Sequence, residues 1–341
     1  MPTADKLVTL ADWQKSTDPR TGEQQMMAEV LNQSNPILGH FKLMPSNLPT
    51  AHVEPIRTDL PEVHLKRVNE GVPSSKSTRS QVTESISLLE SWAIHEEDAL
   101  KMSGDMVAAR RSEVDAHMES MSQKQAEMIF YGSQADDSRM YNGLTVRYDD
   151  TSSNTAPSIH HCGGGGTDNT SVWIVGHGLG KVFGVYPKDT MAGLYHRDFE
   201  LDAITDPSGS GYGSETMAGY RDQMKWHFGL VVKDWRYCQR LCAIDMSDWT
   251  SATGSQAVTQ WGTAVPWVLT RALKRIPVKQ SVDIKIYMSR SGFEAFDTQC
   301  QAITSQNAFK TVDVDGMQKD TFRGYEIVVC DQLRHNEALP A

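Results

Sequence analysis

A long helix with a single apolar stripe is the feature that most constrains what this chain can fold into. Val107, Val114, Met121 and Met128 recur every seven residues, a spacing that places them on one face of a helix. The other faces carry a dense mixture of acidic and basic side chains. The stripe therefore predicts a seam packed on the body of the protein, and this core role is favoured over a cofactor site.

Small and polar residues mark both ends of this predicted helix. Ser103-Gly104-Asp105 offers an N-terminal cap, and Gly132 offers a C-terminal stop. A helix over residues 105–131 would be a rod of roughly 40 Å, at about 1.5 Å per residue.

Residues 41–95 have a different pattern. Prolines separate short stretches in which apolar residues alternate, such as Val63 with Leu65 and Val82 with Ile86. A polar stretch over residues 69–78 lies between them. The pattern predicts a long two-stranded β-ribbon with a polar tip, and such a ribbon needs another surface to pack on.

Residues 1–40 are predicted to form an arm. An apolar stretch that ends at Trp13 precedes a turn, and a short helix with Met26, Met27 and Val30 on one face follows. Asn35-Pro36 is expected to end that helix. So much apolar surface on a short segment indicates a contact with something else.

The rest of the chain predicts a mixed α+β body. Gly163–Gly166 is interpreted as a flexible connector, and residues 206–214 as a Gly/Ser loop. The expected elements are strands at 173–175, 182–186, 226–237 (broken near Lys233-Asp234), 283–288 and 322–330, and helices at 264–276 and 292–305.

Length and charge exclude several classes of protein. The 341 residues predict about two domains. The net charge of −10 is the reverse of what a protein that clamps nucleic acid usually shows. The apolar runs are too short to span a bilayer, and residues 1–13 do not resemble a secretory signal. Five scattered cysteines favour free thiols in a reducing cytoplasm.

Three motifs resemble catalytic or binding sequences but fail on spacing. The glycines before Lys181 do not match a phosphate loop or a dinucleotide fingerprint, and a bend between strands explains them better. His196-Arg197-Asp198 lacks the rest of a kinase catalytic loop. Asp313-Val314-Asp315-Gly316 lacks the spacing of a calcium loop, and a plain turn explains it.

Three clusters could hold a metal or carry acid–base chemistry. In His160-His161-Cys162, adjacent side chains would point to opposite faces of a strand, which opposes a shared metal. Cys238 and Cys242 are best explained as core thiols. His95-Glu96-Glu97-Asp98 fits a solvated helix start. We therefore predict no catalytic, cofactor-binding or metal residues, and the unpartnered arm, ribbon and helix indicate an assembly protein.

The order of these parts resembles the major capsid proteins of tailed bacteriophages, which have the Hong Kong 97-like (Johnson) fold. The local sequence is most similar to those of short-tailed enterobacterial and Bordetella phages. The matching stretches are 10–13, 29–33, 47–50, 57–61, 71–78, 130–132, 143–148, 169–175, 184–188 and 233–237.

The resemblance implies a domain organisation. It implies an N-terminal arm over 1–40, an extended loop over 41–95, and an axial domain over 151–305. The peripheral domain would comprise residues 96–150, with the spine helix at about 105–131, joined by C-terminal strands in 306–341. Trp13, Ser74, Ser75, Lys76 and Arg79 are the candidate assembly contacts.

The resemblance also implies a function. Hexamers and pentamers would close an icosahedral head, of the T=7 type, around double-stranded DNA that is not bound sequence-specifically. Scaffold, portal and cement proteins are implied partners, no membrane is involved, and assembly would take place in the host cytoplasm. Some phages of this fold cross-link a loop lysine. The polar surroundings of Lys66 and Lys76 favour non-covalent assembly here. A tail-tube subunit, or an α+β hydrolase or metal-dependent enzyme with an unrecognised site, stays open as an alternative.

Overall fold

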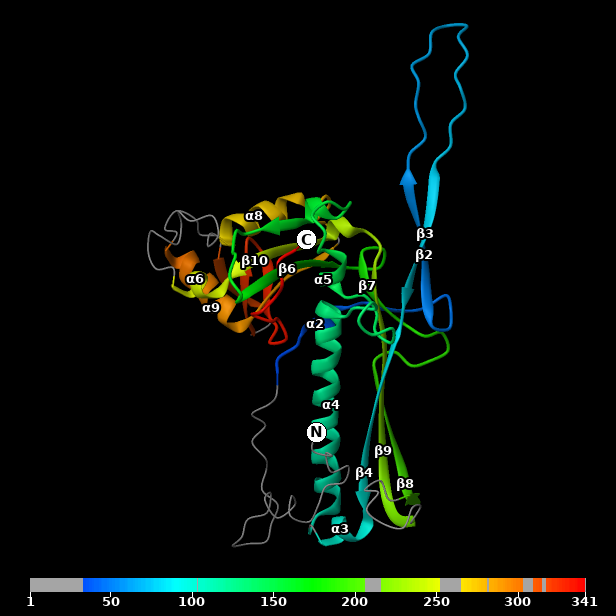
Figure 1. Ribbon diagram of the computed structural model, residues 1–341, viewed down its shortest axis with the longest axis vertical. Coiled ribbons are helices and arrows are strands. Elements are labelled where there is room, and N and C mark those ends of the chain that lie inside the picture. Colours follow the sequence, from blue (N-terminus) through cyan, green and yellow to red (C-terminus); the bar gives the residue numbers. More distant parts are fainter. Residues whose placement is uncertain are drawn as a thin grey trace. The chain divides into compact units, whose positions relative to one another are not determined.

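A computed structural model of the chain describes residues 33–102, 104–205, 216–251, 265–280, 282–302, 309–314 and 317–340 (Figure 1). The chain divides into two compact units. The first comprises Met1–Asn35, Leu88–Ala126 and Gly193–His227, and the second comprises Pro36–Ser87, Glu127–Ala192 and Phe228–Ala341. The arm expected over residues 1–32, with Trp13, lies outside the described residues.

The predicted long helix is confirmed as α4, Met106–Tyr131. Asp105 caps it, because its Oδ1 accepts hydrogen bonds from the amides of Val107 and Ala108 at 3.0 Å each. The helix ends before Gly132, where a Cβ atom would lie 2.5 Å from the carbonyl oxygen of Met128. Both end signals in the sequence therefore correspond to real contacts.

The apolar stripe of α4 is buried except at its start. In the first unit, Val114 and Met121 pack with Ala93 and Met224. Val107 is 74% exposed, so its expected place in the seam is wrong. The first turn instead buries Ala109 against Leu100, with Met106 and Tyr220 packed beside them.

The first unit combines this helix with a sheet. Its strands are β4 (Ser87–Glu96), β8 (Leu194–Thr205) and β9 (Thr216–Val232), and the short α3 (Glu97–Met102) follows β4. Strand β9 pairs with β4 and, antiparallel, with β8. Strand β9 begins ten residues earlier than the expected 226–237 strand, and the Gly/Ser loop predicted over 206–214 lies outside the described residues.

The second unit contains a mixed sheet around the fully buried β6, as predicted from its apolar run. Strand β6 pairs antiparallel with β10 and β11, and β11 pairs parallel with β14. The strands are β1 (Leu43–Pro45), β5 (Ile159–His161), β6 (Asn169–His177), β7 (Val182–Tyr186), β10 (Cys238–Asp245), β11 (Asp283–Met288), β12 (Phe309–Val314), β13 (Met317–Phe322) and β14 (Tyr325–Val329).

Helices pack on this sheet and close the main core. Trp249, Leu269 and Phe296, one from each of the three larger helices, lie in one cluster with Ile174 and Ile286. The helices of the second unit are α2 (Ile37–His40), α5 (Leu144–Arg147), η1 (Ala156–Ser158), η2 (Trp235–Tyr237), α6 (Met246–Ser251), α8 (Val265–Arg275) and α9 (Arg290–Ala302).

Two expectations for this unit are corrected. The closing strand predicted over 322–330 is broken by a turn at Arg323 and Gly324, whose φ angles of 53° and 85° cannot continue a strand. The segment Gly163–Gly166, predicted to be a flexible connector, instead packs closely against the backbone at Ala243. The amide of Gly164 donates to the carbonyl of Ala243 at 2.8 Å, and a Cβ there would lie 2.5 Å from the same oxygen.

The predicted ribbon is confirmed, but only in part. Strands β2 (Ala51–Asp59) and β3 (Thr78–Ser85) pair antiparallel, from Ala51 opposite Ser85 to Asp59 opposite Thr78. Residues 60–77 form a long unpaired loop beyond these strands (Figure 1). The alternation of Val63 and Leu65 therefore does not mark a strand, because neither residue has a strand to pair with.

Candidate assembly surfaces

The loop over residues 60–77 exposes an unusual amount of apolar side chain. Leu60, Val63, Leu65 and Val68 are 71%, 90%, 101% and 91% exposed. One local turn orders its end, where the amide of Arg67 donates to the Glu70 carboxylate at 3.0 Å. Apolar side chains gathered on an extended loop are typical of a surface that binds another chain.

Four of the five assembly contacts predicted from sequence lie on or next to this loop, and the fifth, Trp13, lies outside the described residues. Ser74, Ser75 and Lys76 are exposed, and the Ser75 hydroxyl donates to the carbonyl of Glu62 across the loop at 2.7 Å. Arg79 is exposed on β3, opposite Arg57 of β2. The sequence pattern predicts Val63 and Leu65 as strand residues, so the loop leucines and valines are not among the predicted contacts. The available signal was that Val63, Leu65 and Val68 lie between Pro61 and Pro73, which disfavour a continuous strand.

A buried ion pair anchors the base of the ribbon to the body of the second unit. Both carboxylate oxygens of Glu84 accept hydrogen bonds from Arg147, at 2.6 Å each. The Arg147 guanidinium also donates to the carbonyls of Asn142 and Leu230. Glu84 is only 6% exposed, so this two-pronged pair fixes where the ribbon leaves the body.

A second charged group lies further along β2. Burial alone would raise the pKa of Glu54, but hydrogen bonds from Lys233 and His52 outweigh it and hold the pKa below its usual value. The Lys233 ammonium lies 2.7 Å from Glu54. The carboxylate therefore stays charged and links β2 to the segment after β9.

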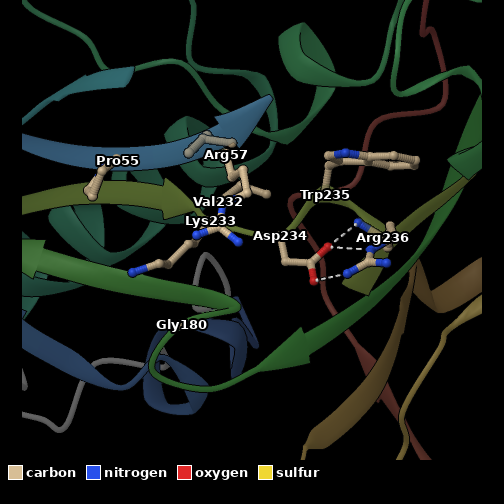
Figure 2. A pocket seen from close by; sticks show the side chains of 9 residues that line it. Pro55, Arg57, Gly180, Val232, Lys233, Asp234, Trp235 and Arg236 are labelled. Atoms are coloured by element: carbon tan, nitrogen blue, oxygen red, sulfur yellow. Dashed lines mark hydrogen bonds and ion pairs between the residues drawn. The ribbon is translucent and has the colours of Figure 1, made fainter. Parts of the chain in front are cut away.

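A pocket of about 510 Å³ opens beside these residues (Figure 2). Pro55, Ile56 and Arg57 of β2 line one part of it, and residues 232–236 with Gly180 line the rest. Asp234 in its wall accepts hydrogen bonds from Arg236, which hold the pKa of Asp234 low against the opposing effect of burial. The pocket thus combines apolar side chains, cationic side chains and the Asp234 carboxylate that is paired with Arg236.

In the first unit, a charged network holds α4 to the β8–β9 pair. The Arg110 guanidinium bonds both carboxylate oxygens of Asp222, and it also bonds Asp198. His196 lies 3.0 Å from the same Asp222 carboxylate. The motif His196-Arg197-Asp198 lies in strand β8, where His196 and Asp198 join this network and the Arg197 guanidinium lies over the Phe199 ring at 4.5 Å.

His95, the first residue of the cluster His95-Glu96-Glu97-Asp98 at the junction of β4 and α3, is buried in this unit. Burial lowers its pKa to about 4, and the positive charge of Arg110 adds to the effect, while Asp222 opposes it. Neither ring nitrogen has a hydrogen-bond partner among the described residues. Glu97 and Asp98 form the first turn of α3, the solvated helix start expected from sequence.

The histidine and cysteine clusters form no chemical centre. His160 is buried and bonds Gln239 at 3.0 Å, whereas His161 is exposed, as the alternation on β5 predicts. Burial raises the pKa of Cys238 to about 12 and that of Cys242 to about 11, so both are inert thiols. In the described part of the chain, no three or more His, Cys, Asp or Glu side chains are grouped to hold a metal.

The two remaining motifs lie next to strands. Gly176 lies within β6, and Gly180, with a φ of 85°, helps the chain to bend into β7, which confirms the strand-bend interpretation. Val314 of β12 pairs directly with Met317 of β13, while residues 315–316 between them lie outside the described part. Of the helices that the structure describes, none has the length and apolar character to cross a membrane.

The long helix, the extended ribbon and the mixed sheet match a solved capsid structure along their whole length. The chain of bacteriophage Epsilon15 aligns with a TM-score of 0.77 and 23% identity, and the alignment covers 100% of both chains. The protein therefore has the Hong Kong 97-like capsid fold. The bacteriophage JBD30 capsid aligns with a TM-score of 0.48 and 9% identity over 90% of this chain and 95% of that one.

The sequence places the chain within this class. The family model for the major capsid protein GP7 matches residues 19–340, so the chain belongs to that family. It is a major capsid protein, a structural component of the virion and not an enzyme. A comparison with curated proteins found no match.

Proposed function

We propose that this chain builds the icosahedral head of a short-tailed bacteriophage, assembling as hexamers and pentamers around double-stranded DNA. The observation that carries the proposal is the loop over residues 60–77, in which Leu65 is 101% exposed. Covering the exposed leucines and valines on a neighbouring subunit would remove a large apolar area from water at every copy of the contact.

Particular residues would make the contacts between subunits, and other virion proteins would bind the shell. Ser74, Ser75, Lys76 and Arg79 would take part in the loop contact, and Trp13 would do so from the arm. Scaffold, portal and cement proteins would be the other protein partners, and assembly would take place in the host cytoplasm. The net charge of −10 supports an inner wall that encloses DNA without gripping it.

The domain assignment belongs to the same proposal. Residues 41–95 would act as the extended loop, residues 96–150 as the peripheral domain and residues 151–305 as the axial domain, in a shell of the T=7 type. The strands in 306–341, assigned to the peripheral domain, include β14, which pairs with β11 of the assigned axial domain. The sheet therefore joins strands from both assigned domains.

Negative-stain imaging of the expressed full chain tests the proposal. The wild type is expected to form closed shells or capsomers, whereas a tail-tube subunit would stack in rings and an enzyme would stay small. The paired substitutions Leu65→Ser and Val68→Ser should prevent shells while leaving the subunit folded. Val278→Ser, at another exposed apolar site (56%), is the matched control and should assemble normally. Normal shells from the loop variant would contradict the proposed contact.

A further inference from the structure

Two arginines face each other on the ribbon. Arg57 of β2 lies directly opposite Arg79 of β3, and both side chains are exposed. No ion pair to either is present among the described residues. Like charges directly opposite on an antiparallel pair are destabilising, so this position would gain from an anion that binds both.

Arg57 also lines the 510 Å³ pocket (Figure 2). The two other cations of that pocket are already neutralised, Lys233 by Glu54 at 2.7 Å and Arg236 by Asp234 at 2.9 Å. Arg57 is therefore the lining cation without an ion pair among the described residues, and Arg79 lies opposite it on β3.

The apolar part of the pocket shows what kind of anion fits. Pro55, Ile56, Val232 and the ring of Trp235 line it beside the arginine. A phosphate backbone offers nothing to these side chains. A carboxylate next to an apolar side chain would satisfy both parts, and aromatic residues and arginines are the residue types enriched where protein partners bind.

A segment with this chemistry is exposed in the first unit of the same chain. The pairing of β8 with β9 shifts between Phe199 and Asp202, so Glu200 and Leu201 together lie opposite the single residue Tyr220. Such a bulge re-aims side chains and is typically a functional feature. Leu201 is 48% exposed, and Glu200 is exposed with no ion pair among the described side chains.

We propose that the Arg57–Arg79 pocket binds the Glu200-Leu201 bulge of a second copy of this chain. The Glu200 carboxylate would lie between the two guanidinium groups, and Leu201 would pack on Ile56 and Trp235. The inference rests on the shell assembly proposed above, because that assembly surrounds every subunit with further copies.

Charge reversal tests the pairing in the full-length chain. Arg57→Glu with Arg79→Glu, or Glu200→Arg alone, should each lower the fraction of protein in particles by roughly ten-fold, because like charges would then meet. Combining all three substitutions restores opposite charges and should restore assembly to within about two-fold of wild type. Arg111→Glu, at a side chain that is 82% exposed, is the matched control and should assemble normally.

The outcomes separate this inference from the proposed function. Failure of the wild type to form particles overturns the proposed function. Normal assembly of both reversed variants, or no rescue by the combination in a chain that melts like wild type, overturns only the pocket. A loss of packaged DNA with intact shells would assign the arginines to phosphate and would also overturn it.

Cross-linking in assembled particles gives a second readout. Arg57→Cys with Glu200→Cys, treated with a short bis-maleimide, should give linked subunits that neither single variant gives. Four of the five native thiols are buried, and Cys300 is partly buried, so the background should be low. Arg57→Cys with Asp98→Cys is the control pair, and equal linking in that pair would contradict the assignment.

Discussion

Met121 is a single residue on the buried side of α4 whose replacement tests the core of the first unit. It is 6% exposed and packs with Ala93, Val114 and Met224. Met121→Asp would bury a carboxylate with no partner and should lower the free energy of unfolding by roughly 3–5 kcal/mol. Met121→Leu keeps the volume and should cost less than about 1.5 kcal/mol. Urea denaturation checks both, and an aspartate variant as stable as wild type would show that this face is not buried.

His95 predicts how stability depends on pH. Its pKa is about 4 in the folded chain and near 6.5 when unfolded, so the unfolded state binds the proton first as the pH falls. The stability that His95 contributes is therefore complete above about pH 6.5 and is lost between about 6.5 and 4, by roughly 3 kcal/mol.

Replacing this ring should remove that dependence. His95→Leu should melt like wild type at pH 7.5 and lose less stability than wild type at pH 5, because no proton can then be taken up at this position. His335→Leu, at an exposed ring, is the control and should keep the wild-type pH profile. Melting curves at the two pH values suffice, and parallel losses in wild type and His95→Leu would refute the assignment.

At the scale of elements, the sequence predicts those helices and strands that a local residue pattern determines. The helix α4 follows from its stripe and from Asp105 and Gly132, and β6, β7 and β11 follow from short apolar runs. The β8 strand was not predicted, because its exposed side chains mix charged and apolar residues and its partner β9 begins only at Thr216. The prediction of strand around Val63 and Leu65, in the unpaired loop over 60–77, was wrong because alternation alone cannot show whether a partner strand exists.

The candidate surfaces were harder to predict than the fold. Ser74, Ser75 and Lys76 were selected by resemblance and do lie exposed on the loop. The pocket beside Arg57 joins β2 to a segment near residue 235, and sequence separation of that size carries no local signal. The same holds for the contact between Glu84 and Arg147.

The ion pair between Glu84 and Arg147 is expected to stabilise the base of the ribbon. Arg147→Met should destabilise the chain by roughly 3–5 kcal/mol, because it leaves the Glu84 carboxylate buried without its partner. The double variant Arg147→Met with Glu84→Met removes both charges and should recover much of that loss. Guanidinium denaturation measures the cycle, and additive losses in the double variant would mean that the two side chains do not act as a pair.

At the scale of the whole molecule, we expect shells held together without covalent links between subunits. Lys66 and Lys76, the loop lysines that could form such links, are both exposed, whereas a bond of this kind needs a lysine held in a dry pocket. Heads boiled in SDS with reductant should therefore run as one band at 38.0 kDa. A ladder of multiples would refute this, and peptide mapping would identify the lysine responsible.

The central claim is that this chain forms a closed shell in which the extended loop of each subunit lies on a neighbour. Cryo-electron microscopy of purified particles tests it most directly. The account predicts an icosahedral shell with residues 60–77 ordered against the adjacent subunit and with Leu65 and Val68 covered by it. A map of stacked rings, or of a shell in which these two side chains face solvent, would contradict the account.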